Sequence, residues 1–532
     1  MRDRENWWSI PCALLAVIAA LPSAAQSPAP LTLADALQAT LLRHPQLGIQ
    51  EQQVIAQRGA LQQASGQFDL ALAGDASQGH TYRALTGFEE FQYSQFDNFN
   101  STSATTNNSQ MAFAATKELR NGIVVSPSIT SSRITDNLTN RQGINQGKIQ
   151  LAATIALLRG RGRTVVAAQE AASADQLKAA QFEVNETVSV LLATVASSYW
   201  NVVAAEKQLE VLRESESRAQ ALAESTRSLI DADRLPRTDL NEVEANMAVR
   251  ETNRLTGEQR LVEARQQLAI DMGLDASEMS ALPETATGFP EEISPEDIPA
   301  DPQSLQRYIQ LALDQRPELR ALKQREEASR RIAVASRDAM RPELDVKVAT
   351  GVSGLDEGTR IDEYLLSPVH SIRGADLSAG ITYRFSPGRN AAAGAYEQAA
   401  AMSRQADLQY QEMARRIAAA VGPALYGFRS EALQLRRTRD AVQLYRNSLD
   451  AEREKLRMGA GSVINTINVE DRLTGSLASE VQAQLEYLQA LVRLRLATST
   501  IVAPDRQAGS VDPAIFTTAP PLPAEAKAGT SK

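Results

Sequence analysis

Cysteine is nearly absent from this chain of 532 residues, because Cys12 is the only one. It lies in an apolar run over residues 10–21, which follows two arginines and precedes the small residues 23–25. This order predicts a secretory signal peptide over residues 1–25, since the run is shorter than the ~20 residues that a membrane-spanning helix needs. A chain cleaved near Ala25 would contain no cysteine, which excludes disulfides, cysteine zinc sites and a thiol nucleophile.

Aromatic residues are also scarce, at 5% of the chain, and the net charge is −9. Few aromatics with much Ala, Gln, Glu and Arg are typical of long helices, and the charge gives no support to nucleic-acid binding. The three histidines, His44, His80 and His370, lie in separate segments, so we expect no metal site. Gly160-Arg161-Gly162 lacks the Lys-Ser/Thr of a phosphate-binding loop. We therefore expect no cofactor, no catalytic residues and no enzyme activity.

What the chain does have is a long duplication. Residues 162–239 and 388–465 have the same length at an offset of 226, and each copy has the residue pattern of a helix. In the first copy, apolar residues from Val184 to Val202 recur at spacings of three or four, which is the seam of a coiled coil. About 70 helical residues make a rod of roughly 100 Å, which is too long for a globular domain.

A second match shows that the duplication also includes the start of each half. His44-Pro45-Gln46-Leu47 corresponds to Arg316-Pro317-Glu318-Leu319 at an offset of 272. The offsets of 272 and 226 differ by 46, so the first repeat has about 46 extra residues between its opening helix and its long helix. Period-two alternation, as in Phe68 to Leu72, predicts strands in this region of both repeats.

These patterns predict two repeats, at 26–272 and 304–503, with a linker over 273–303. The tail over 504–532 is expected to be partly disordered. Residues 91–110, rich in Asn, Ser and Thr, are predicted to be a solvated loop, with 98–108 outside the cell. Each repeat is predicted to contain an opening helix, a β-hairpin region, a long helix and a return helix: 31–66, 68–158, 162–233 and 239–272 in the first, then 304–341, 342–386, 388–457 and 465–502 in the second.

The chain resembles the TolC family of outer-membrane efflux and secretion channels. Four features carry the resemblance: the Leu-Thr-Leu-x-Asp-Ala-Leu opening at 31–37, the His44-Pro45 segment, the long-helix entrances at 157–162 and 385–388, and the helix reversals at 229–240 and 455–468. The resemblance implies a mainly α fold with a β membrane part. It implies a homotrimer in which each repeat gives two strands to a shared 12-stranded barrel, continued by a periplasmic α-helical barrel. Four strands cannot close alone in hydrocarbon, so oligomerisation is required.

The resemblance also implies where a gate lies. The turns at Leu235-Pro236 and at Gly459-Ala460-Gly461-Ser462 would be the periplasmic tips. In the family, the second-repeat tip has two acids that constrict the pore. Asn465 and Asn468 occupy those positions here, which weakens the expectation of cation binding.

Each candidate gate residue also has a simpler interpretation. Asn465 and Asn468, three residues apart, share a helix face that is either a pore ring, a solvated face or a cap. The first-repeat tip keeps the acids Asp239 and Glu242. Asp239 is better explained as an N-cap or first-turn acid at the positive end of a helix than as a gating residue.

The resulting functional hypothesis is a passive exit duct in the outer membrane of a Gram-negative bacterium, in contact with outer-membrane lipid. The expected partners are a periplasmic adaptor and an inner-membrane transporter, and the expected cargo is small molecules or drugs. One alternative is the channel of a type I protein-secretion system. Another, of a different class, is a periplasmic coiled-coil protein without a pore, against which the alternating segments argue.

Overall fold

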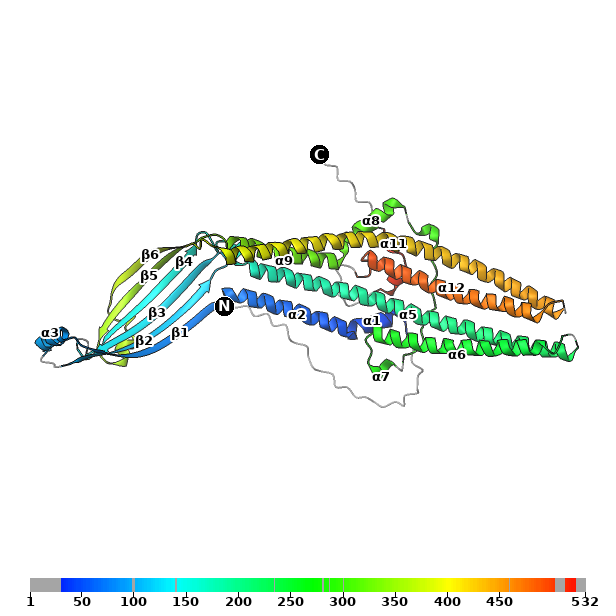
Figure 1. The fold of residues 1–532 in the computed structure, drawn as a ribbon, viewed down its shortest axis with the longest axis horizontal. Coiled ribbons are helices and arrows are strands. Elements are labelled where there is room, and N and C mark those ends of the chain that lie inside the picture. The colour runs from blue at the N-terminus through cyan, green and yellow to red at the C-terminus, as the bar shows by residue number, and fades with distance from the viewer. Residues whose placement is uncertain are drawn as a thin grey trace, which may run out of the picture.

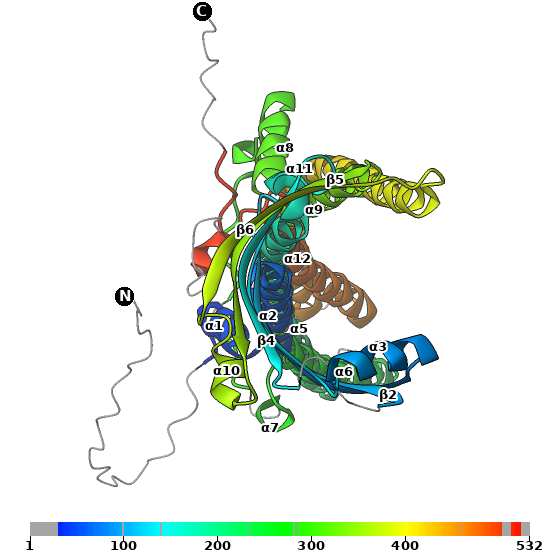
Figure 2. The ribbon, with the colours of Figure 1, turned by 90° about the vertical axis from the view of Figure 1, so that its left-hand side faces the viewer.

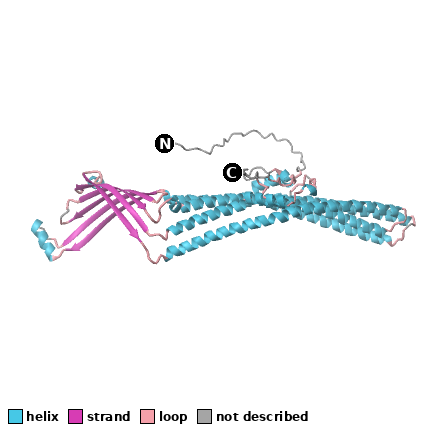
Figure 3. Cartoon of the chain, turned by 90° about the horizontal axis from the view of Figure 1, so that it is seen from above, coloured by secondary structure: helices cyan, strands magenta, loops and turns pink. Residues whose placement is uncertain are grey.

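The protein is one elongated body with a sheet at one end and long helical hairpins at the other (Figures 1 and 3). It is seen here in a computed structural model that describes residues 30–97, 101–138, 141–233, 235–279, 282–286, 288–299, 301–458, 460–502 and 512–522. The predicted signal peptide lies outside the described residues. The mainly α fold with a β part is confirmed.

Each opening helix is divided in two, where the sequence predicts one continuous helix. The first repeat has α1 (Leu33–Arg43) and α2 (Pro45–Ser65), and the second has α8 (Pro302–Gln315) and α9 (Pro317–Asp338). The break precedes a proline in both, because proline has no N–H to donate and disfavours helical geometry in the residue before it. Asp301 caps α8, and His44 caps α2 by accepting from the Gln46 N–H at 3.1 Å.

The long helices form antiparallel hairpins with the return helices. In the first repeat, the short α4 (Arg163–Val166) precedes α5 (Ala168–Asp231), which returns as α6 (Asp239–Asp271). In the second, α11 (Asn390–Arg457) returns as α12 (Val463–Ala497), which ends before the predicted residue 502. The 64 residues of α5 make a rod of about 96 Å. A cluster of buried apolar residues, including Val195, Leu425 and Leu491, joins the two hairpins in the middle of the molecule.

Among the described residues, the β part is one curved sheet of six antiparallel strands in sequence order (Figure 2). The resemblance implies two strands per repeat, whereas the first repeat supplies four. The strands are β1 (Leu70–Ala84), β2 (Ser103–Glu118), β3 (Ile123–Asp136) and β4 (Ile144–Ala156) from the first repeat, and β5 (Glu343–Glu357) and β6 (Ile372–Arg384) from the second.

The predicted solvated loop over residues 91–110 is wrong for most of its length. Residues 87–97 form the helix α3 (Gly87–Asp97), and β2 already begins at Ser103. The first half of β2 is polar on both faces, so it lacks the alternation by which a half-buried strand is recognised. Its partner strand supplies the backbone hydrogen bonds that the sequence pattern did not reveal, as in the pairing of His80 with Asn107.

Part of the predicted disordered tail is packed on the helices. Residues 513–516 form the short 3-10 helix η3 (Pro513–Phe516), and Phe516 is completely buried. The Arg495 guanidinium of α12 donates to the carbonyl oxygens of Thr518 and Ala519 at 2.9 and 3.0 Å. Burial lowers the pKa of Arg495 to about 10. The linker likewise contains α7 (Ala276–Met279) and η2 (Pro295–Asp297).

The two faces of the sheet differ in polarity. Side chains alternate between faces, so the register defines rows that cross all six strands. One face holds the row Gly74, Phe113, Ile129, Ile149, Val352 and Ala375. The adjacent row on the other face is Ala73, Ala114, Ser128, Gln150, Gly351 and Asp376. The first is called the apolar face below, and the second the polar face.

The apolar face is the convex side of the sheet. The loop between β5 and β6, with the helix α10 (Ile361–Leu365), folds onto this face and lies on the convex side (Figure 2). Nearer the helices the same face exposes large side chains that no other described residue of the chain covers. These include Leu72, Phe113, Ile129, Leu151, Leu377 and Ile381.

Candidate functional site at the helical tips

Both helical hairpins end at the side of the molecule opposite the sheet (Figure 1). The α5–α6 turn spans residues 232–238, and the α11–α12 turn spans residues 458–462. An apolar cluster joins the two ends. It consists of Ala223, Val243, Leu456, Val463 and Ile467, with Leu222, Leu229 and Leu235 packed against it. The predicted tip residue Leu235 therefore has a structural role in holding the hairpins together.

The structure places the other predicted tip residues on or beside these turns. Asn465 and Asn468 are both exposed in the first two turns of α12, and Ser462 is its N-cap residue without a side-chain cap bond. Gly461 packs so closely that a Cβ there would lie 2.7 Å from the Leu456 nitrogen. Pro236 is exposed. Gly459 lies outside the described residues.

The two acids of the first-repeat tip lie in the first turn of α6. Asp239 is the first residue of the helix and is half-buried, while Glu242 is exposed. Their carboxylates therefore lie near the positive end of the helix dipole. This position agrees with the interpretation of Asp239 as a first-turn acid.

A buried ion cluster lies just behind the tips. Glu470 of α12 has a side chain that is 4% exposed, and Arg218 of α5 forms an ion pair with it. Arg453 of α11 donates to the same carboxylate at 3.3 Å. Thr474 donates to Ser215 at 3.1 Å and accepts from Arg218 at 3.4 Å. One carboxylate thus connects three helices from both hairpins.

A second ion pair connects α6 with α12. Arg250, with a side chain that is 9% exposed, pairs with the half-exposed Asp471. Burial lowers the pKa of Arg250, and the charge of Glu470 opposes that shift. Since removing one partner of a buried pair leaves an uncompensated charge, these contacts hold the hairpins in one arrangement.

Sequence reasoning missed this cluster although a signal for it was present. The buried seam of α12 runs through Val463, Ile467, Glu470, Thr474 and Leu477, in alternating steps of four and three. Glu470 is a charged residue in an apolar seam, and such residues need a partner when buried. The partner, Arg218, lies 252 positions away and cannot be identified without the fold.

The candidate gate residues share helix faces with residues of a polar groove. Residues three or four positions apart lie on the same face of a helix. By this spacing, Asn468 shares a face of α12 with Ser479, Gln482 and Glu486. Asp239 and Glu242 likewise share a face of α6 with Arg260, Glu263 and Gln267. These six groove residues line a hollow of about 850 Å³ between the hairpins. The asparagines therefore continue a polar surface that extends along the helices.

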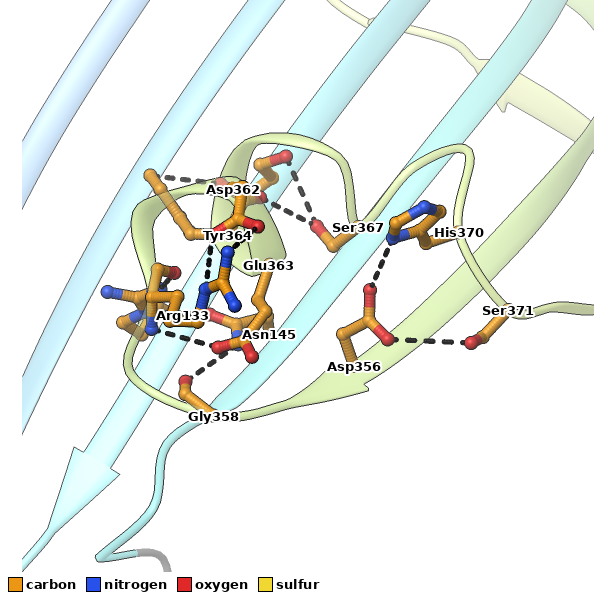
Figure 4. Close-up of polar contacts among 12 residues, drawn as sticks. Arg133, Asn145, Asp356, Gly358, Asp362, Glu363, Tyr364, Ser367, His370 and Ser371 are labelled. Carbon is orange, nitrogen blue, oxygen red and sulfur yellow. Dashed lines mark hydrogen bonds and ion pairs between the residues drawn. The ribbon is translucent and has the colours of Figure 1, made fainter.

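The α10 loop is fixed to the sheet by a separate polar cluster (Figure 4). The Arg133 guanidinium donates to Asn145 at 2.6 Å and to the Thr359 carbonyl at 3.1 Å, and lies 5.1 Å from the Tyr364 ring centre. His370 pairs with Asp356 at 3.3 Å. Within the described part of the chain, no group of three or more His, Cys, Asp or Glu side chains is arranged to hold a metal ion. This cluster shapes the end of the sheet that lies away from the helices.

A curved sheet with an apolar convex face is thus continued by helical hairpins of about 100 Å. Comparisons with known proteins found similar arrangements. Residues 308–500 match the family model described as outer membrane efflux protein. The predicted resemblance to TolC-type channels is therefore confirmed. No curated protein sequence matches the chain significantly.

Solved structures of such channels share the fold over most of its length. The outer-membrane channel CmeC of Campylobacter jejuni has a TM-score of 0.63 at 13% identity, over 94% of this chain and 96% of that one. VceC of Vibrio cholerae has a TM-score of 0.61 at 14% identity, over 88% and 95%. The open MtrE channel of Neisseria gonorrhoeae has a TM-score of 0.59 at 14% identity, over 88% of each chain.

Proposed function

We propose that the protein is the outer-membrane exit duct of a tripartite efflux pump, through which small molecules pass passively out of a Gram-negative cell. Three copies would form the duct. A periplasmic adaptor and an inner-membrane transporter would supply the substrate and the energy. The observation that carries the proposal is the apolar face of the sheet, which is joined directly to helices long enough to extend deep into the periplasm.

Membrane physics supports this assignment. Hydrocarbon satisfies no backbone hydrogen bond, so a sheet that spans a membrane must have no free edge. The apolar face fits lipid, and the polar face, which includes Lys148 paired with Asp376 at 3.4 Å, fits a water-filled lumen. A periplasmic coiled-coil protein without a pore has no use for such a sheet, so this alternative is disfavoured.

At the tips, we propose that Asn465 and Asn468 line the aqueous opening and that the ion cluster around Glu470 holds it closed. Both asparagines are exposed on the face of α12 that continues into the polar groove. Because an amide carries no net charge, this ring would attract cations much less than a ring of carboxylates.

Planar-bilayer recording with the purified protein tests the duct. We expect discrete conductance steps, and their complete absence from protein that is inserted and oligomeric would refute the proposal. Accumulation of a fluorescent dye in cells with and without the protein then tests the cargo. Unchanged dye accumulation together with loss of one secreted protein would instead favour the type I secretion channel.

A further inference from the structure

The surplus of about 46 residues in the first repeat corresponds to an additional hairpin, β2–β3. These strands lie between β1 and β4, which are the two strands that continue into helices of the first repeat. The hairpin could lie within the membrane wall, fill the lumen or project from the surface. Three independent observations distinguish these positions.

The first observation is the continuity of both faces across the hairpin. Phe113 and Ile129 extend the apolar row between Gly74 and Ile149, and Ala114 and Ser128 extend the polar row beside it. Phe113 is 58% exposed, although the chain has a buried core available elsewhere. A hairpin that filled the lumen would have water on both sides and no reason to keep one apolar face.

The second observation is the anchoring of the β2–β3 turn to both helix junctions. Gly122 has φ +91°, and a Cβ there would lie 2.2 Å from the Gly160 carbonyl oxygen. The Asn121 carbonyl accepts from the Gly162 N–H at 3.1 Å. Arg120 donates to Glu170 of α5 at 2.7 Å and lies 4.7 Å from the Phe68 ring centre. The turn therefore occupies a fixed position at the level where the helices end.

The third observation is the regular slant of the sheet. A line of paired residues starts at Leu70, the first residue of β1, and reaches Ala379, five positions before the end of β6. It passes through Lys117, Val125, Ala153 and Val348. Across five strand pairs, the line of paired residues therefore shifts by five residues relative to the strand ends, which is on average one residue per strand pair. With ~3.3 Å per residue and ~4.8 Å between strands this corresponds to about 35°, within the range of closed barrels.

We infer that β2–β3 is part of the membrane wall, and that β1 and β6 pair with β6 and β1 of neighbouring copies, so that three copies close an 18-stranded barrel. The inference rests on the proposed trimeric duct. It replaces the 12 strands that the family resemblance implies. Because barrel diameter grows roughly linearly with strand number, the outer opening would be about 1.5-fold wider. Barrels of 16–18 strands leave an aqueous channel.

Lipid contact of single labelled positions tests the wall. In a Cys12→Ser background, we would place a bimane-labelled cysteine at Phe113 or Ile129 on the apolar face, or at Ala112 or Thr130 on the polar face. Brominated lipid should quench the first two at least about twofold more than the second two, as it should for Ile149 against Gln150 of β4. Equal quenching within both hairpin pairs, with a difference retained in β4, would overturn the wall position.

Native mass spectrometry of the same labelled particles provides the copy number. If the particles contain three copies and lipid quenches the label at position 113, the barrel has 18 strands. Two copies would give 12 strands and overturn the 18-stranded barrel. Three conducting copies whose Phe113 label is not quenched would refute the inference and leave the duct function intact. A protein without conductance at any copy number would instead refute the proposed function.

Discussion

The two repeats are alike at the helical end of the molecule but differ at the sheet end. At the helical end, both repeats have the same plan, with a long helix, a turn and a return helix. At the sheet end, the first repeat contributes four strands and the second contributes two. Helical hairpins must keep equal length to reach the same level, whereas a sheet accepts an added hairpin without changing its faces. The length of the hairpins is therefore constrained at the helical end, whereas the number of strands can vary at the sheet end.

The largest expected effect is a charge on the apolar face of the inserted hairpin. Phe113→Arg should destabilise the assembled protein by about 2–4 kcal/mol if this side chain faces hydrocarbon. Ala112→Arg, one residue away on the polar face, is the matched control and should change little. The measurement is the yield of heat-sensitive oligomer in membranes. Equal yields of the two variants would remove the distinction between the faces.

At the helical end, the corresponding test is the buried carboxylate behind the tips. Glu470→Gln removes the buried carboxylate that Arg218 and Arg453 share and leaves Arg218 only the exposed Glu214, so we expect a loss of about 3 kcal/mol and more frequent open-channel events. Glu214, which contacts Arg218 at 3.3 Å but is exposed, provides the control Glu214→Gln with an effect below about 0.5 kcal/mol. Thermal unfolding and single-channel recording are the two readouts. If both variants behave like the unmodified protein, the cluster does not hold the hairpins together.

A smaller effect is expected at the anchored turn of the inserted hairpin. Gly122→Ala places a Cβ against the Gly160 carbonyl in a conformation that side chains rarely adopt, which should cost about 1–3 kcal/mol. Gly79→Ala in β1 is the control, since a Cβ there meets nothing within 4 Å. Thermal unfolding should therefore separate the two variants. Equal thermal stability of the two variants would show that the β2–β3 turn is not packed against the helix ends.

The smallest effect on stability, but a clear one on conduction, is expected at the tip. Replacing both asparagines, Asn465→Asp and Asn468→Asp, would place six carboxylates around the opening of a trimer. Like charges so close raise each other's pKa and attract cations. Multivalent cations added on the periplasmic side should therefore block the variant more strongly than the unmodified channel. Equal block in bilayer recordings would show that these residues do not face the pore.

The helical part was largely predictable because its signal is periodic and long. Spacings of three and four residues indicated both long helices, and the repeat offset located their turns. The sheet was harder to predict, since Ser103 to Gln110 form a strand that is polar on both faces. The break before Pro45 follows from local chemistry, whereas the pairing of Glu470 with Arg218 depends on helices brought together by the fold. Local sequence patterns can therefore predict a helix break, but not an ion pair between residues far apart in the chain.

Strand order has a consequence for how the chain folds. Neighbouring strands are joined by connections of at most 18 residues except between β4 and β5, where the paired residues Ala156 and Asp345 are 189 positions apart. The first four strands can therefore pair while the second repeat is still unfolded, but β4 then presents an open edge until β5 arrives. Closing such a long loop is slow, and an open edge invites aggregation. Chaperone protection during assembly should therefore matter most in the interval between completion of the first repeat and docking of β5.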